Sequence, residues 1–327
     1  MNEKQNSKLK SANKFIAPFL KLGIFLLLIW SIYHKLQSEN FYQLTTTFWL
    51  NFNSTNLIWL IFGILLMPLN WGIEAFKWKL LISKIEDINW WTSLQAICAG
   101  ITLAMFTPNR IGEFGGRVLL LKNASRIEGI AITLIGSFSQ IVASFSIGLL
   151  GWIFFYTNFL TNDSSLIFAL TGLSILSAIA LFLLYYNLEW VKKILDKLPF
   201  SKKTKSYFNP IVKYSILELS TFLALSASRF VIFSFQYCLF FWALGINIDL
   251  PTALMLIFSI FFVQTIIPSI AIVELGIRGK VALYFMDFVK ANSLAVLTAA
   301  FGLWMVNLLF PAFIGFLVLL RKKNFVE

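Results

Sequence analysis

The sequence has few charged side chains and very few residues suited to metal or redox chemistry. Only 13% of its 327 residues are charged, whereas soluble domains carry about a quarter. It has one histidine, His34, and two cysteines, Cys98 and Cys238, which lie in apolar runs. These residues do not have metal-ligand spacing, and two isolated cysteines do not build a disulfide framework. The composition excludes an ordinary soluble domain, and nothing in it supports a metal site.

The common catalytic motifs are also missing. No phosphate-binding loop occurs, and no Ser or Cys stands in a pattern that pairs it with a histidine. We therefore expect a protein without a cofactor that is not an enzyme, although an intramembrane enzyme built from carboxylates alone stays open. The first apolar run lacks a small-residue cleavage site, so we do not expect a cleavable signal peptide.

Apolar side chains make up the bulk of the chain. They account for 58% of the residues, with 35 Phe, and the mean hydropathy is +0.79. Runs of this length can cross a bilayer core of about 30 Å as helices. We predict an all-α polytopic membrane protein, with one membrane domain over 15–321 between tails at 1–14 and 322–327. About six full spans are expected, at 15–33, 56–81, 128–156, 164–186, 216–244 and 293–320.

The net charge of +12 is explained by the placement of the basic residues. Nineteen of the 27 Lys and Arg lie in the tails and in alternate loops, while the opposite loops hold only Lys35 and Lys290. Basic residues are enriched in cytoplasmic loops. We therefore expect both termini in the cytoplasm, a location in the cell (inner) membrane, and no nucleic-acid partner.

Two short stretches break the apolar pattern with Pro, Gly and charge. Thr107–Arg117 contains Glu113 and Arg117, and Pro268–Arg278 contains Glu274 and Arg278. Both copies read Pro, a gap, then Glu-apolar-Gly-x-Arg, at an offset of 161 residues. Charges at membrane depth are costly unless they are paired or solvated. Each stretch therefore marks a broken membrane segment.

We interpret each broken segment as the turn of a re-entrant helical hairpin, with two full crossings as the alternative. The first hairpin has limbs at 92–106 and 111–121, and the second at 251–267 and 271–288. Shifting the first half by 161 residues places its elements on those of the second half with opposite topology. Inverted repeats of this kind are common in secondary transporters. The expected half-repeats are 15–157 and 164–321.

The charged limbs of the two hairpins are the candidate substrate site. Their N-terminal ends carry free amide groups and a partial positive charge that attract anions. We expect a phosphate-bearing lipid head group to bind there, near glycines that allow close backbone approach. The candidate residues are Arg110, Glu113, Arg117, Glu274 and Arg278. The alternative is that each Glu and Arg pair only stabilises its own helix.

Other polar residues also lie within the predicted spans or near their ends. Arg229 lies in the middle of a span and needs a partner, either in a structural ion pair or along a substrate path. Gln140, Gln236, Gln264 and Asn307 are expected to form hydrogen bonds between helices. Near the end of the second span, Glu74, Lys77 and Lys79 are expected at a solvated interface, beside an aromatic belt of Trp71, Trp78, Trp90 and Trp91.

These motifs resemble those of a known family. Thr107-Pro108-Asn109-Arg110-Ile111-Gly112-Glu113 with Arg117, and Glu274-Leu275-Gly276-Ile277-Arg278 after Pro268, are similar to the flippase-like membrane domain of lysylphosphatidylglycerol synthases. The first motif is a close match. In the second, Ser269-Ile270-Ala271-Ile272-Val273 stands where family members have glycines, and Gly279 stands where Glu follows the arginine.

The resemblance implies a flippase-like protein that moves a lipid with a charged or glycosylated head group between leaflets. Some family members carry an attached synthase or glycosyltransferase domain, whereas this chain resembles a stand-alone membrane unit. The alternative is a membrane subunit that does not transport and instead anchors or assists a lipid-modifying enzyme.

Overall fold

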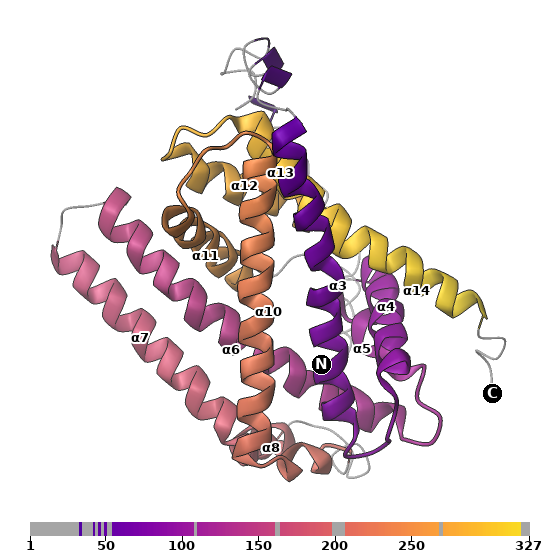
Figure 1. Ribbon diagram of the computed structural model, residues 1–327. Helices are drawn as coiled ribbons and strands as arrows, with labels where there is room; N and C mark the ends of the chain where they lie inside the picture. Colours follow the sequence, from indigo (N-terminus) through magenta and orange to yellow (C-terminus); the bar gives the residue numbers. More distant parts are fainter. Residues whose placement is uncertain are drawn as a thin grey trace, which may run out of the picture.

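The computed structural model describes the chain from Ser54 to Arg321, apart from 108–109, 161–163, 198–206 and 268–270, and a few positions between 33 and 50. The described part is helical (Figure 1). Within the described residues, five helical segments are long and apolar enough to cross a membrane: Asn56–Ile82, Arg126–Leu160, Phe168–Tyr186, Ile216–Ala243 and Ser293–Arg321. They match five of the six expected spans, whereas the expected span at 15–33 lies almost entirely outside the described residues.

The order of the helices along the chain agrees with the order of the apolar runs in the sequence. The first half contains α3 (Ser54–Ile82), α4 (Trp90–Phe106), α5 (Gly112–Val118), α6 (Arg126–Phe155) and the π-helical turn η2 (Tyr156–Leu160). The second half begins with α7 (Ser164–Tyr186), α8 (Leu188–Lys197) and the short 3₁₀ helix η3 (Asn209–Lys213). It continues with α10 (Ile216–Ala243), α11 (Leu250–Ile266), α12 (Ala271–Asp287), α13 (Ser293–Trp304), the π-helical turn η4 (Met305–Leu309) and α14 (Phe310–Arg321).

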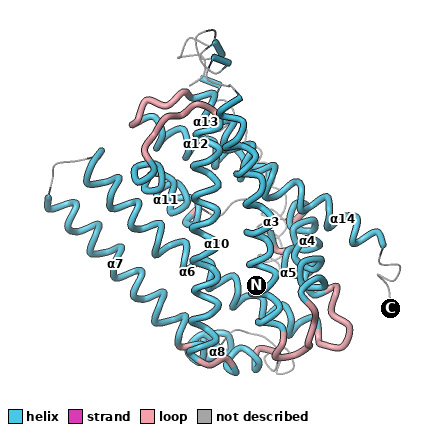
Figure 2. Tube along the Cα trace, in the orientation of Figure 1, coloured by secondary structure: helices cyan, strands magenta, loops and turns pink. Residues whose placement is uncertain are grey.

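Two long helices from the two halves form the centre of the assembly. α3 and α10 lie side by side, and a broken segment flanks them on each side (Figure 1). α4 packs against α14, whereas α11 packs against α6, so the apolar limb of each broken segment rests on the last long helix of the other half. The loops that lead into α4 and α11 lie at opposite ends of the assembly (Figure 2). The two apolar limbs thus start at opposite ends of the assembly.

The apolar limbs start at matching helix caps. The Asn89 side chain accepts a hydrogen bond from the backbone N–H of Thr92 at 2.7 Å, and Asp249 accepts one from Thr252 at 3.0 Å. Such caps satisfy an amide group that has no partner within the helix. Asn89 and Asp249 are therefore the N-caps of α4 and α11. Both α4 and α11 then end after 17 residues, directly before the broken stretch.

The glycines of the first broken stretch are needed for packing between α4 and α5. A Cβ atom on Gly116 would lie 2.6 Å from the backbone oxygen of Ala99, and one on Gly112 would lie 2.3 Å from that of Leu103. No side chain fits at either position. The expectation that these glycines allow the backbone to approach a ligand is wrong for Gly112 and Gly116, because their Cα atoms face α4.

Adjacent glycines provide a matched test of this contact. Gly116→Ala is expected to reduce the free energy of unfolding by about 1–3 kcal/mol, because the added methyl group overlaps backbone that cannot move aside. Gly115→Ala is the control, since within the described part of the chain nothing outside its own helix lies within 4 Å of the position that its methyl group would occupy. Thermal unfolding of the purified protein in detergent measures both. Equal losses in the two variants would contradict the close-packing explanation.

A carboxylate links the loop before α4 to the loop after α5. Glu86, in the loop before α4, accepts hydrogen bonds from the backbone N–H groups of Lys122, Asn123 and Ala124 at 2.8–3.1 Å. Partial burial raises the pKa of Glu86, but the three N–H donors favour the ionised form and bring its pKa below the ordinary 4.5. Ionised Glu86 therefore fixes the position of the loop that follows α5.

The stabilisation by Glu86 is expected to depend on pH. Because its pKa is lower in the folded state, the contribution is fully present above the unfolded-state pKa and is lost as the pH falls through the folded value. Glu86→Gln should lower the unfolding temperature at pH 7 and flatten its decline below pH ~4.5. Unfolding scans of both proteins between neutral and acidic pH test this. Parallel pH curves would show that Glu86 makes no such contribution.

Candidate functional site

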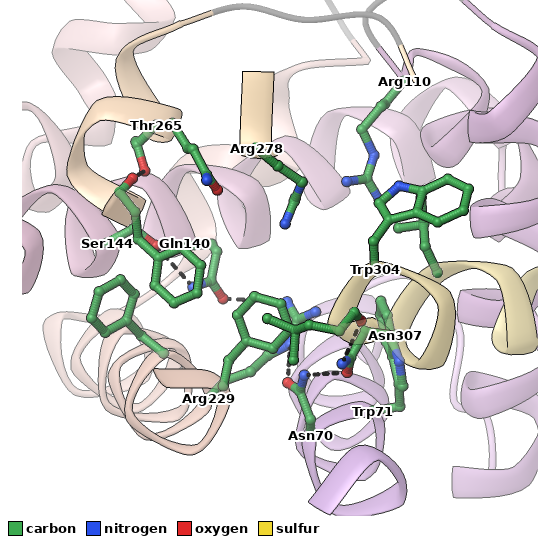
Figure 3. A pocket seen from close by; sticks show the side chains of 16 residues that line it. Asn70, Trp71, Arg110, Gln140, Ser144, Arg229, Thr265, Arg278, Trp304 and Asn307 are labelled. Carbon is green, nitrogen blue, oxygen red and sulfur yellow. Dashed lines mark hydrogen bonds between the residues drawn. The ribbon is translucent and has the colours of Figure 1, made fainter. Parts of the chain in front are cut away.

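A cavity of about 230 Å³ lies where the two halves meet, and three arginines line it (Figure 3). Arg110 comes from the tip of the first broken segment, Arg278 from α12 and Arg229 from α10. Arg110 and Arg278 point toward the cavity from one side, and Arg229 lies across from them (Figure 3). The other described residues of the lining have amide, hydroxyl and apolar side chains: Asn70, Trp71, Gln140, Ser144, Phe230, Phe233, Phe261, Gln264, Thr265, Leu303, Trp304, Asn307 and Leu308.

Arg110 reaches this cavity from an unusual backbone conformation. Its φ angle is 57°, in the left-handed region that side-chain-bearing residues seldom adopt. Its backbone N–H donates to the carbonyl oxygen of Thr107 at 3.3 Å, which tightens the turn. Strained backbone of this kind occurs most often at functional sites. The tip of the first broken segment thus presents an arginine at some conformational cost.

Arg229 is held by polar partners on α3 and α6. Its Nε donates to Asn70 Oδ1 at 2.8 Å, and its Nη1 reaches Glu74 Oε2 at 3.1 Å and Gln140 Oε1 at 3.4 Å. The guanidinium group also lies 4.7 Å from the centre of the Trp71 ring, which attracts cations. Arg229 therefore has the partner that its position demanded, and it lines the cavity as well.

Glu74 is the carboxylate around which the neighbouring cations gather. Its Oε2 contacts Lys77 at 2.9 Å and Arg229 at 3.1 Å, and its Oε1 contacts Arg117 at 2.9 Å. Glu74 and Lys77 are only 3% and 1% exposed. The expectation that they sit at a solvated interface is wrong, because they face α5, α6 and α10 on the inner side of α3. Trp78 is also fully buried and donates to Thr133, so it does not belong to an exposed aromatic belt.

Arg117 and Glu113 do not line the cavity. The Arg117 side chain is 5% exposed, and its two terminal nitrogens contact Glu74 at 2.9 Å and Glu113 at 2.5 Å. Glu113 also approaches Arg110 at 3.5 Å. The expected pairing of Glu and Arg four residues apart is therefore present in the first motif. The positive charge of Arg117 is balanced by Glu74 and Glu113 inside the protein. Glu113 connects this buried pair to the arginine at the cavity.

The second motif places Arg278 at the cavity. Glu274 lies one turn earlier on α12, and its side chain is outside the described residues. α12 contacts α4, so the two broken segments meet across the centre. Of the six predicted site residues, the structure thus brings Arg110, Arg229 and Arg278 together at one cavity, and it places Glu113 and Arg117 behind them.

A series of hydrogen-bonded amide side chains extends from the arginine-lined cavity along the interface of α3, α10 and η4. Asn70 donates to Asn307 Oδ1 at 3.2 Å, Asn307 donates to Gln236 Oε1 at 2.9 Å, and Gln236 donates to the carbonyl oxygen of Gly63 at 2.7 Å. The predicted interhelical hydrogen bonds of Gln236 and Asn307 are confirmed. Gln140 bonds Arg229 and lines the cavity, and Gln264 lines it too.

Comparison with protein families decides the relationship of the chain. Residues 19–315 match the family described as the lysylphosphatidylglycerol synthase TM region. The chain belongs to this family. The match covers nearly the whole sequence, which confirms the resemblance seen in the two motifs. No curated protein and no solved structure matches the chain.

Membership in this lipid-handling family, together with the apolar helices, makes the chain a multi-pass membrane protein. Among the described residues of this family member, no group of His, Cys, Asp and Glu is arranged to hold a metal ion. Cys98 and Cys238 are buried, unpaired thiols, as expected of packing residues.

The residues that the motifs did not reveal lie on α3. Asn70, Glu74 and Lys77 are spaced by four and three residues, which puts them on one helical face. A polar stripe of this kind inside an otherwise apolar span indicates contact with polar groups of neighbouring helices. The sequence contains this pattern, but polar residues near the end of a predicted span also fit a solvated interface.

Proposed function

We propose that this family member moves a lipid with an anionic, phosphate-bearing head group between the two leaflets, and that the head group binds in the arginine-lined cavity. The observation that carries the proposal is the convergence of Arg110, Arg229 and Arg278 on one cavity within a membrane protein. Guanidinium groups bind phosphate oxygens through paired hydrogen bonds. An anion there would also be attracted by the surrounding charge.

The charged side chains that line the cavity or lie directly behind it form a cluster, and the formal charge of this cluster supports an anionic ligand. It contains five cationic side chains and three carboxylates even when Glu274 is counted with them, which leaves an excess of two positive charges. Such an excess is costly at membrane depth unless a counter-ion is present. The residues are Lys77, Arg110, Arg117, Arg229 and Arg278, against Glu74, Glu113 and Glu274.

Two indole groups add hydrogen-bond donors. In the described part of the chain, the N–H groups of Trp71 and Trp304 are buried and have no acceptor, and both residues line the cavity. Trp304 lies beside Arg110, with its nitrogen on the side of the cavity (Figure 3). Buried donors normally have partners. Phosphate, glycerol or sugar oxygens would provide them, which agrees with a charged or glycosylated head group.

The same proposal includes an inverted repeat with two re-entrant hairpins. Adding 161 to the bounds of α3 gives 215–243, close to the bounds of α10, Ile216–Ala243. α4 and α11 have 17 residues each, fewer than the roughly 20 that a full crossing needs. The exchanged packing of α4 on α14 and of α11 on α6 also supports it.

The orientation can be tested with single cysteines in a variant without Cys98 and Cys238. Cysteine at Lys213, in η3, is expected to react only from the cytoplasm, and cysteine at Lys290 only from outside. The reason is the enrichment of basic residues in the loops on the side of Lys213. A membrane-impermeant maleimide applied to intact cells and to inverted vesicles distinguishes the two faces. Labelling of both positions from one face would contradict the inverted repeat.

Leaflet exchange measured with purified components tests the function. The protein is reconstituted into phosphatidylcholine vesicles with trace fluorescent phosphatidylglycerol, a fluorescent polyprenyl phosphate, or fluorescent phosphatidylcholine as the control without net charge. Dithionite quenching of the outer leaflet then follows exchange, and lipid extraction afterwards shows whether any lipid was covalently changed. We expect faster exchange of an anionic probe without a new product. Rates equal to those of protein-free vesicles for every probe, with an enzyme that co-purifies, would favour the accessory-subunit alternative.

A further inference from the structure

A second hollow, purely apolar, lies on the outside of the helices that border the arginine cavity. It has a volume of about 560 Å³ and is lined by residues of α3, η4 and α14, among them Ile64, Met67, Met305, Leu309, Phe310 and Phe313. Most of these side chains are 39–60% exposed. Because these helices are membrane spans, the groove opens toward the hydrocarbon core.

The groove and the cavity lie along the same pair of helices. On α3, Met67 lines the groove, and Trp71, one turn later, lines the cavity. On the last span, Met305 and Leu309 line the groove, while Asn307 between them lines the cavity. A polar site and an apolar site thus lie on opposite sides of the contact between α3 and η4, which we call the seam.

An amide–amide hydrogen bond crosses that seam. Asn70 on α3 donates to Asn307 on η4 at 3.2 Å, and η4 is the main contact of α3 with the last span. η4 is a π-helical turn, a local widening that often occurs at functional sites. Asn307 also donates to the carbonyl oxygen of Leu303 at 3.1 Å. The seam is therefore closed by side-chain amides that can exchange partners, and Asn70 also binds Arg229 of the cavity.

We propose that the groove binds an acyl chain of the lipid whose head group occupies the arginine cavity, so that the seam between α3 and η4 is the lateral passage between them. This inference rests on the proposed function. A lipid is amphipathic and needs a polar site and an apolar site in direct succession, which is what the two sides of this seam offer. The chain remains in apolar surroundings while its head group reaches the arginines.

Photo-crosslinking of the full chain in vesicles tests the site without depending on transport. The probe is phosphatidylglycerol with a diazirine in one acyl chain, in a background of phosphatidylcholine, and labelled residues are located by mass spectrometry. We expect labels to concentrate at 64–67 and 305–313 and to fall several-fold when the probe is phosphatidylcholine or when Arg278 is changed to Gln. Equal labelling by both probes, unaffected by Arg278→Gln, would show ordinary boundary lipid and overturn the proposal.

A groove-filling variant separates this inference from the proposed function. Leu309→Trp should reduce both the labelling and the exchange of long-chain phosphatidylglycerol several-fold, yet leave binding of the short-chain dihexanoyl form unchanged. Leu173→Trp on α7, where the leucine is 62% exposed, is the matched control. Head-group-dependent labelling without any exchange would refute transport and leave the groove site intact. Normal exchange in Leu309→Trp without groove labelling would refute the groove site and leave transport intact.

Discussion

Replacing Glu74 with glutamine is expected to be the most destabilising single change among the buried residues of the cluster. The carboxylate contacts Lys77, Arg117 and Arg229 at 2.9–3.1 Å while it is itself 3% exposed. A neutral amide leaves these three cations close together without their shared counter-ion. Removing one partner of a buried ion pair typically costs about 3–5 kcal/mol. We expect a loss of this order in the free energy of unfolding, with a lower yield of folded protein.

Thermal unfolding in detergent and the monodisperse yield from size-exclusion chromatography measure the effect. Glu189→Gln on α8 is the control, because Glu189 is exposed. The double variant Glu74→Gln with Lys77→Met removes one of the excess cations and should recover part of the lost stability. A Glu74→Gln protein as stable as the Glu189→Gln control would show that the cluster does not depend on this carboxylate.

The helices could be predicted because hydropathy acts locally along the chain. The bounds expected for the spans and limbs agree with α3, α4, α6, α10, α11 and α12 within a few residues. The partners of Arg229 could not be predicted in the same way. Asn70 and Glu74 are 159 and 155 residues away in sequence, and only the packing of α3 against α10 brings them to the guanidinium group.

The glycines and Trp78 show how one pattern supports two structures. Glycine beside arginine suits both a backbone that approaches an anion and a backbone that approaches another helix. Gly112 and Gly116 serve the second purpose, because their missing Cβ atoms face α4. Tryptophan near the end of a span suits an interface as well as a core, and Trp78 is buried against Thr133. Sequence alone does not show which neighbour a residue faces.

The two motif arginines that follow their carboxylates by four residues are expected to behave differently when changed to glutamine. Arg117 is buried between Glu74 and Glu113, so Arg117→Gln should lower the folded yield and stability. Arg278 lines the cavity, so Arg278→Gln should leave the folded yield close to normal and impair transport. The sequence motifs alone predicted a binding role for both residues.

The Arg278→Gln variant should reduce exchange of the anionic probe at least tenfold. A hydrogen bond to a charged group contributes about 1.5–3 kcal/mol, which corresponds to a factor of roughly 10–150 in an equilibrium constant. Arg278→Lys should recover part of the activity, because lysine keeps the charge but not the planar pair of donors. Lys280→Gln on the same helix is the matched control, since Lys280 does not line the cavity.

Exchange rates are normalised to folded protein, and binding of dihexanoyl phosphatidylglycerol is measured in parallel by isothermal calorimetry. A head-group role predicts that binding and exchange fall together in Arg278→Gln, whereas exchange in the Lys280→Gln protein stays near the wild-type rate. Arg110→Gln should resemble Arg278→Gln, because both guanidinium groups point toward the same cavity from opposite halves of the chain (Figure 3). If Arg278→Gln and Arg110→Gln keep full exchange and full binding as folded proteins, the arginine cavity is not where the head group binds.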